Sequence, residues 1–157
     1  LRRVGDDFAA VVVTAAGIAR PRVQDAAQPE PLPIEIMLPA PGQGALAIEV
    51  AAGADAGLMA ALQQLDDPAT RAAVTAEREL LAALEAGCSA PVGALALTDE
   101  PSYWEPEVYL RGGIFTRESF VRMSVTGAAS AAAELGRELA SRLLAAGGTG
   151  LLSESMK

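Results

Sequence analysis

The strongest constraint on the fold is a run of helix-forming residues that ends abruptly. Residues 75–86 read TAERELLAALEA, and Ala, Leu, Glu and Arg are all strong helix formers. Gly87 follows as a candidate for the left-handed conformation at a helix C-cap, and Pro91 prevents the helix from resuming. Cys88, the only cysteine of the chain, is therefore expected just beyond the end of a helix.

Two interpretations of Cys88 follow from its position. Leu81, Leu84 and Cys88 are three and four positions apart, which places them on one helix face. A lone cysteine in such a stripe is usually a small buried hydrophobe. The negative end of the helix dipole and the carboxylate of Glu85 both disfavour a thiolate here. A nucleophilic Cys88 would therefore need a cationic group from elsewhere or a very reactive electrophile.

Composition narrows the function classes. The chain has 157 residues, 51% of them hydrophobic, which suits one domain or slightly more. A net charge of −8 argues against nucleic acid or an anionic membrane as partner. The absence of histidine excludes imidazole catalysis and histidine-based metal sites, so no metal is expected.

The location and completeness of the protein can also be inferred from the sequence. A single cysteine cannot form an intrachain disulfide and suits a reducing, cytoplasmic setting. No apolar run approaches the roughly 20 residues of a membrane span. Because the sequence starts with Leu1 rather than Met, we expect it to be the C-terminal part of a longer chain.

The N-terminal third contains several apolar runs separated by turn residues. Residues 8–14 read FAAVVVT, which predicts a strand covered on both faces, and residues 15–18 predict a tight turn into a short helix. Residues 21–33 are proline-containing and lack apolar periodicity, as in a linker. Residues 34–38 and 45–50 predict two further short strands.

The rest of the chain predicts helices grouped with a small sheet. After a loop at 51–57, apolar residues at 58, 61, 62 and 65 follow helical spacing. Asp67 is the expected N-cap and Pro68 the first residue of the next helix, which runs to the Cys88 turn.

Three strands are predicted at 92–97, 107–112 and 119–125, with Val108 and Leu110 on one face. A final helix over 130–146 places its leucines four apart, allows Glu138 to pair with Arg142, and is closed by Gly147 and Gly148. The expected class is α+β, with a three-stranded antiparallel sheet packed by helices and preceded by α/β remnants of other domains.

Three segments carry a family resemblance. Residues 84–93, LEAGCSAPVG, are similar to the segment LEGGCxxP[IV]G of the hydroxymethylbilane synthase family, also called porphobilinogen deaminase, with Ala86 replacing the first glycine. Residues 38–49, LPAPGQGALAIE, resemble the family segment LPAxGQGA[LV]xIE. Residues 9–21 resemble DA[IV]VLAxAGLxRL, with Ala9 and Pro21 in place of the usual aspartate and leucine.

The resemblance implies roles for three residues. Cys88 would carry a dipyrromethane cofactor through a thioether. Arg20 matches an arginine that binds pyrrole acid side chains, and Gln43 would contact a pyrrole carboxylate or carbonyl. No catalytic residue is expected in this chain, because the family's catalytic aspartate and most of its basic residues lie N-terminal to all of these segments.

The resemblance also implies an activity and a domain partition. The complete enzyme would be a cytoplasmic, monomeric transferase of haem and tetrapyrrole biosynthesis that joins four porphobilinogen units with release of ammonia. Residues 1–43 would end the second domain, 44–65 would return to complete the first, and 66–157 would form the cofactor-carrying third domain. Its partners would be porphobilinogen and the missing N-terminal portion, without which this chain is expected to be inactive.

A non-enzymatic alternative remains open from the residues alone. An acidic α+β ligand-binding or regulatory domain could hold Cys88 simply as part of its core. Such a domain would carry no covalent adduct, and its thiol would resist alkylation until unfolding. A redox-sensing cysteine is disfavoured, because the sequence has no second cysteine to resolve it.

Overall fold

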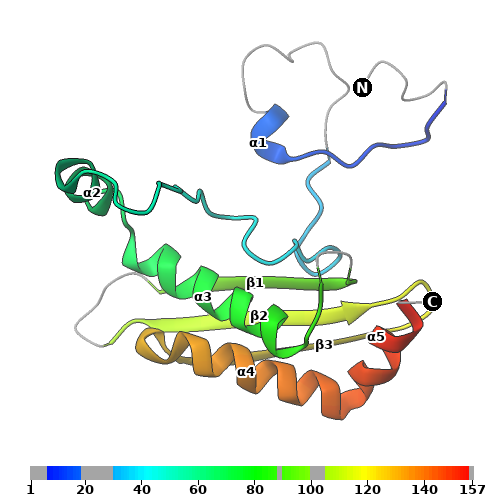
Figure 1. Cartoon of the computed structure of the whole chain (residues 1–157). Coiled ribbons are helices and arrows are strands. Elements are labelled where there is room, and N and C mark those ends of the chain that lie inside the picture. Colours follow the sequence, from blue (N-terminus) through cyan, green and yellow to red (C-terminus); the bar gives the residue numbers. More distant parts are fainter. Residues whose placement is uncertain (1–6, 19–29, 88–89, 100–104, 156–157) are drawn as a thin grey trace. The chain divides into compact units, whose positions relative to one another are not determined.

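The computed structural model describes residues 7–18, 30–87, 90–99 and 105–155 (Figure 1). The chain divides into two compact units, residues 1–36 and 37–157. In the first unit the described residues contain helix α1. The described elements are α1 Ala15–Ile18, α2 Ala56–Gln63, α3 Pro68–Ala83, β1 Val92–Thr98, β2 Glu107–Phe115, β3 Phe120–Ala128, α4 Ala132–Leu143 and α5 Thr149–Ser155.

The sheet is three-stranded and antiparallel, in the order β1-β2-β3. In its register Ala96 lies opposite Leu110, and Leu110 lies opposite Val125. The three strands occur where the sequence predicts them, although β2 and β3 each extend three residues further. The expectation of an α+β fold with helices on an antiparallel sheet is confirmed.

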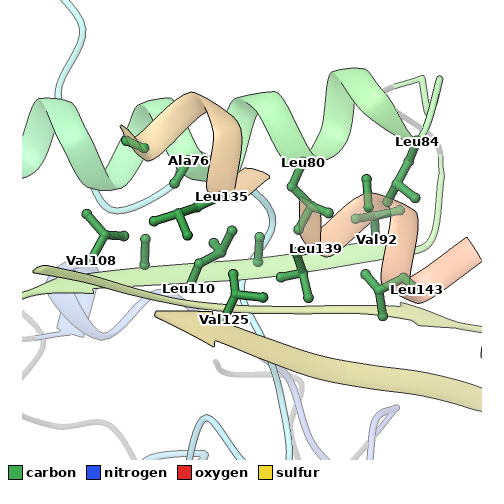
Figure 2. Packing of buried hydrophobic residues seen from close by; sticks show 14 of the residues in the cluster. Ala76, Leu80, Leu84, Val92, Val108, Leu110, Val125, Leu135, Leu139 and Leu143 are labelled. Atoms are coloured by element: carbon green, nitrogen blue, oxygen red, sulfur yellow. The ribbon is translucent and has the colours of Figure 1, made fainter. Parts of the chain in front are cut away.

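Helices α3 and α4 pack on one face of this sheet and enclose the core (Figure 2). Alternate residues of β2, among them Val108 and Leu110, face the helices and are fully buried, whereas Tyr109 and Arg111 between them are partly exposed. This is the half-covered pattern expected of an antiparallel strand. The largest fully buried side chains are Leu80, Leu110, Ile114, Leu139, Leu143 and Val108.

Glycines allow the layers to approach closely. A Cβ atom at Gly112 of β2 would lie 2.5 Å from Cδ2 of Leu80 and 2.9 Å from Cδ2 of Leu139. A Cβ atom at Gly136 of α4 would lie 2.5 Å from the carbonyl oxygen of Ala76 in α3. Helices α3 and α4 therefore contact each other nearly backbone to backbone at Gly136, and Gly112 lets the Leu80 and Leu139 side chains pack directly on the backbone of β2.

The other face of the sheet carries rings and guanidinium groups. The guanidinium carbon of Arg111 lies 5.0 Å from the centroid of the Tyr109 ring, and that of Arg122 lies 5.4 Å from the Phe115 ring. The rings of Phe115 and Phe120 stack at 6.1 Å. Such cation–π contacts stabilise partly covered cations against an aromatic surface.

Helix α3 begins as predicted but ends differently. The carboxylate of Asp67 accepts a hydrogen bond from the backbone N–H of Thr70 at 2.7 Å, and Pro68 is the first helical residue. The last helical residue is Ala83, and the left-handed residue is Glu85, with φ of 52°. The prediction that Gly87 provides the left-handed C-cap is therefore wrong.

Hydrogen bonds explain why the helix ends at this point. The N–H of Glu85 donates to the carbonyl of Ala82, and the N–H of Ala86 donates to the carbonyl of Leu81. This pair of bonds is the Schellman arrangement, which satisfies carbonyls that the helix leaves open. The backbone bonds and the packing of Leu81 and Ala86 against the core outweigh the preference for glycine at the left-handed position.

The predicted final helix is interrupted. Helix α4 keeps the predicted buried leucines and the Glu138–Arg142 ion pair, but at Gly147 the backbone takes a φ of 103°. A second helix, α5, then continues to Ser155. The helical backbone therefore breaks at Gly147, directly after the predicted last residue, and α5 is a further helix that the sequence analysis did not predict.

The three N-terminal strand predictions are wrong for the described residues. Residues 10–14 and 46–50 have no regular secondary structure, and residues 34–36 form a turn with a hydrogen bond from Ile36 N–H to the Pro33 carbonyl. A regular strand needs a partner strand along its length, and among the described residues none of these segments joins the sheet of β1, β2 and β3. The predicted short helix at 15–18 is confirmed as α1, and α2 begins two residues before the predicted helix, capped by Asp55.

Candidate functional site

The Gly-Gln-Gly turn, residues 42–44, follows a segment that packs on the edge of β1. Leu38 is buried, and a Cβ atom at Gly93 would lie 2.7 Å from the Leu38 Cβ atom. The N–H of Ala94 donates to the carbonyl of Pro39 at 2.9 Å. Residues 38 and 39 therefore cover the open edge of the sheet with a backbone hydrogen bond and an apolar contact.

Beyond this contact the chain turns and presents Gln43. Gly42 has a φ of 78°, a left-handed conformation that glycine adopts without penalty. The N–H of Gln43 donates to the carbonyl of Ala40 at 3.3 Å, and the Gln43 side chain is exposed. A primary amide offers donors and an acceptor together, which suits the predicted contact with a carboxylate or a carbonyl.

A buried carboxylate joins this turn to the helix and the sheet. Glu77 of α3 is 5% exposed. One of its oxygens accepts from the N–H of Gly42 and the other from the N–H of Ala96 in β1, both at 2.7 Å. These lengths are typical of charge-assisted hydrogen bonds. Among the described residues, Glu77 is the one buried side chain that is polar or charged.

Cys88 lies outside the described residues, as does Arg20, so the structure does not test their predicted roles. The residues that flank positions 88 and 89 are described. The N–H of Ala90 donates to the carbonyl of Gly87 at 2.9 Å, and the carbonyl of Pro91 accepts from the N–H of Phe115 at 2.8 Å. The Schellman turn fixes the chain before Cys88, and β2 fixes it after.

The glycines on either side of Gln43 and before Cys88 differ from those of the core. Apart from the adjoining residues, no atom of the described part of the chain lies within 4 Å of where a Cβ atom would be at Gly87 or Gly44, and Gly87 and Gln43 are both exposed. Within the described ranges, no three His, Cys, Asp or Glu side chains gather as a metal site, and no helix is long and apolar enough to cross a membrane.

The sequence prediction overlooked Glu77. The signal was a glutamate inside the apolar stripe of α3, next to Ala76 and three residues before Leu80, which are both fully buried. A charge at such a position requires partners, because an unpaired buried charge is strongly unfavourable. The sequence pattern did not indicate that two backbone N–H groups from distant segments would provide them.

Two family models match this chain. A family model described as the porphobilinogen deaminase C-terminal domain matches residues 71–145. A second, described as the dipyromethane cofactor binding domain of porphobilinogen deaminase, matches residues 1–59. The first range contains Glu77 and the sheet, and the second contains Gln43.

Similar curated proteins carry the same name. Porphobilinogen deaminase from Nocardia farcinica is 51% identical over 162 aligned positions, covering 98% of this chain and 46% of the relative. The protein of that name from Mycobacterium tuberculosis is 47% identical over 153 positions, covering 93% of this chain and 48% of the relative. Porphobilinogen deaminase 1 from Streptomyces avermitilis is 55% identical over 116 positions, covering 70% of this chain and 36% of the relative.

The chain spans less than half the length of these relatives. The two family models cover all three segments that resemble the family, residues 9–21, 38–49 and 84–93. Together they leave only residues 60–70 and 146–157 unmatched. The sequence, the α+β fold and these matches agree, and the chain belongs to the porphobilinogen deaminase family.

Proposed function

We propose that this chain is the C-terminal, cofactor-carrying part of a hydroxymethylbilane synthase. The complete enzyme joins four porphobilinogen units head to tail with release of ammonia, as a transferase of haem and tetrapyrrole biosynthesis. The observation that carries this proposal is the match of both family models along one chain. The name of the relatives, porphobilinogen deaminase, agrees with the loss of ammonia.

In this proposal Cys88 is the attachment point. Attachment replaces the S–H bond of Cys88 with an S–C bond to a pyrrole methylene, and ammonia leaves with the thiol proton. The tethered dipyrromethane supplies the free pyrrole end on which the product grows. The described residues on either side support this proposal: Gly87 is exposed, and the carbonyl of Pro91 accepts a hydrogen bond from the N–H of Phe115.

Gln43 and Arg20 position the bound group. The exposed amide of Gln43 binds a pyrrole carboxylate or carbonyl, and the guanidinium of Arg20 pairs with an acid side chain. The proposal assigns no catalytic acid or base to this chain. A chain of net charge −8 repels a polycarboxylate, so the missing N-terminal portion supplies most of the basic groups and the catalytic aspartate.

The same proposal explains the exposed apolar residues of the N-terminal segments. Val12, Leu46 and Ile48 are 68%, 99% and 59% exposed, which is far more than apolar segments show in a finished core. They support the prediction that residues 1–43 and 44–65 complete domains whose other strands lie in the missing portion. Residues 66–157 form the third domain in this partition. The cytoplasmic location and the monomeric state stay predictions.

The decisive experiment is an intact mass under denaturing conditions, followed by peptide mapping, on the complete enzyme. We expect two additional pyrrole units on the peptide that contains Cys88. A Cys88→Ala variant should lack the adduct and lose turnover. An unmodified cysteine combined with normal turnover in Cys88→Ala would refute the thioether proposal.

A second experiment tests the dependence on the missing portion. The isolated 157-residue chain should release no ammonia from porphobilinogen, and adding the N-terminal portion should restore release if the two parts assemble. Ammonia release by the isolated chain would show that its own residues are sufficient for catalysis.

A further inference from the structure

We propose that Glu77 is a positioning residue. It holds the turn that contains Gln43 against the sheet edge, and so fixes where the Gln43 side chain lies when it binds the cofactor or the growing product. This inference rests on the proposed function of Gln43 and adds a residue to which the family resemblance assigns no role. Its basis is that a single carboxylate joins two segments far apart in sequence. Gly42 is 35 positions from Glu77, and Ala96 is 19 positions from it.

The geometry requires a carboxylate. Both partners of Glu77 are N–H donors at 2.7 Å, and an ionised carboxylate has two oxygens that only accept. A glutamine could accept one of these bonds, but its NH₂ group would face the other donor. Glutamate is therefore the residue of this length that satisfies both N–H groups at once.

Burial makes the clamp strong. With 5% exposure, the Glu77 carboxylate has little water to replace its partners, so loss of either N–H leaves a costly buried charge. Conversely, removal of the carboxylate leaves the N–H of Ala96 without an acceptor at a buried position. Both hydrogen bonds therefore stabilise the contact, which holds the turn against α3 and β1.

The clamp acts on the part of the turn that presents Gln43. Gly42 directly precedes Gln43, and its left-handed backbone points its N–H toward Glu77. The other bonds of the turn are the Ala94–Pro39 contact and the 3.3 Å bond between Gln43 and Ala40. Glu77 therefore provides the short contact nearest to Gln43.

Glu79 offers a matched control on the same helix. Its carboxylate is exposed and binds Arg137 at 2.8 Å, and it does not contact the turn. Glu79→Gln changes the net charge by the same amount as Glu77→Gln without touching residues 38–44. An effect of charge alone would appear in both variants.

The first measurement is amide hydrogen exchange at residue resolution in the complete enzyme. In Glu77→Ala we expect exchange at Gly42 and Ala96 to accelerate at least about tenfold, as for loss of a hydrogen bond to a charged group. Glu77→Gln should give a smaller acceleration, and Glu79→Gln none. Unchanged exchange at both amides, or acceleration that is equal at Leu110 in the core, would overturn the inference.

The second measurement separates positioning from stability. Turnover is normalised to the cofactor content found by mass spectrometry, so that unfolded protein does not count. Glu77→Ala should lower kcat about tenfold or more with a smaller change in KM, because Gln43 binds the tethered group in our proposal, and Glu77→Gln should recover part of the loss. A kcat that is sensitive to Gln43→Ala but not to Glu77→Ala would overturn the inference. A kcat that is insensitive to Gln43→Ala would instead reject the proposed role of Gln43.

Discussion

Two regions of the second unit differ in how far they bury leucine side chains. Leu139, in the helix-and-sheet region of residues 66–155, is fully buried, whereas Leu46, in the segment of residues 37–65, is 99% exposed. Both leucines occur in sequences with a clear apolar pattern. The difference is that α4 has a sheet to pack on within this chain, while residues 45–50 pair with none of the strands β1, β2 and β3 of the described residues. An apolar pattern therefore predicts a tendency to be buried, and the fold depends on which partners the chain itself contains.

Leucine-to-alanine substitutions at these two positions should give the largest contrast. Leu139→Ala leaves a cavity between α4 and the sheet and should lower the free energy of unfolding by about 2–5 kcal/mol. Leu46→Ala removes no contact in the core and should change it by less than about 0.5 kcal/mol. Urea denaturation of the 157-residue chain measures both values. Equal effects would mean that residues 45–50 are packed in solution.

The same contrast explains how far the sequence could predict the fold. Helix α3, the three strands and the buried face of α4 were predictable because their periodicity is clear and their packing partners lie within the described part of this chain. The strands expected at 8–14, 34–38 and 45–50 did not form. An apolar run indicates that a segment tends to be buried, but it does not indicate which strand the segment would pair with.

The site was only partly predictable, for a similar reason. The Gly-Gln-Gly turn was recognisable from the family pattern. The structure shows Gln43 exposed on this turn, and its role in binding stays a prediction. The link through Glu77 was not, because a single glutamate in a helix gives no sign of which distant N–H groups it will meet. The left-handed residue at the end of α3 is Glu85 and not the predicted Gly87 for a different reason. Packing of the next residue, Ala86, against the core outweighs the preference of the left-handed conformation for glycine.

Glycine-to-alanine substitutions should sharpen the comparison with effects of opposite sign. At Gly136 a Cβ atom would lie 2.5 Å from the Ala76 carbonyl oxygen and 2.8 Å from the Leu80 nitrogen, and backbone atoms move only with the whole helix. Gly136→Ala should therefore destabilise the protein by about 1–3 kcal/mol. Gly150→Ala in α5 meets nothing within 4 Å and should stabilise by at most about 1 kcal/mol through helix propensity. Thermal unfolding of both variants at one pH tests the pair, and a stable Gly136→Ala would contradict the close approach of α3 and α4.

Glycine at position 85 should stabilise the end of α3. Glu85 has a φ of 52°, which costs a residue with a side chain about 1–2 kcal/mol, and Glu85→Gly should recover about 1 kcal/mol after its larger loss of chain entropy. Glu85→Ala keeps the strain and removes the carboxylate, so its stability should change little. The two variants separate backbone conformation from charge in chemical denaturation. A larger gain from alanine than from glycine would show that charge near the helix end is the dominant effect.

The smallest expected effect lies at the other end of α3 and depends on pH. Hydrogen bonding from the backbone N–H of Thr70, and then from its side chain, lowers the pKa of Asp67 below its ordinary value of 3.8. A carboxyl group with a lowered pKa in the folded state stabilises the fold when ionised, so this contribution is complete above pH 3.8 and is lost as the pH falls through the folded value. Asp67→Asn keeps a good N-cap but cannot ionise, and the other carboxyl groups titrate alike in both proteins. The difference in Tm between wild type and Asp67→Asn should therefore be constant at neutral and mildly acidic pH and shrink toward zero below pH 3.8. A difference that persists unchanged in acid would mean that Asp67 stabilises α3 through the geometry of its cap and not through its charge.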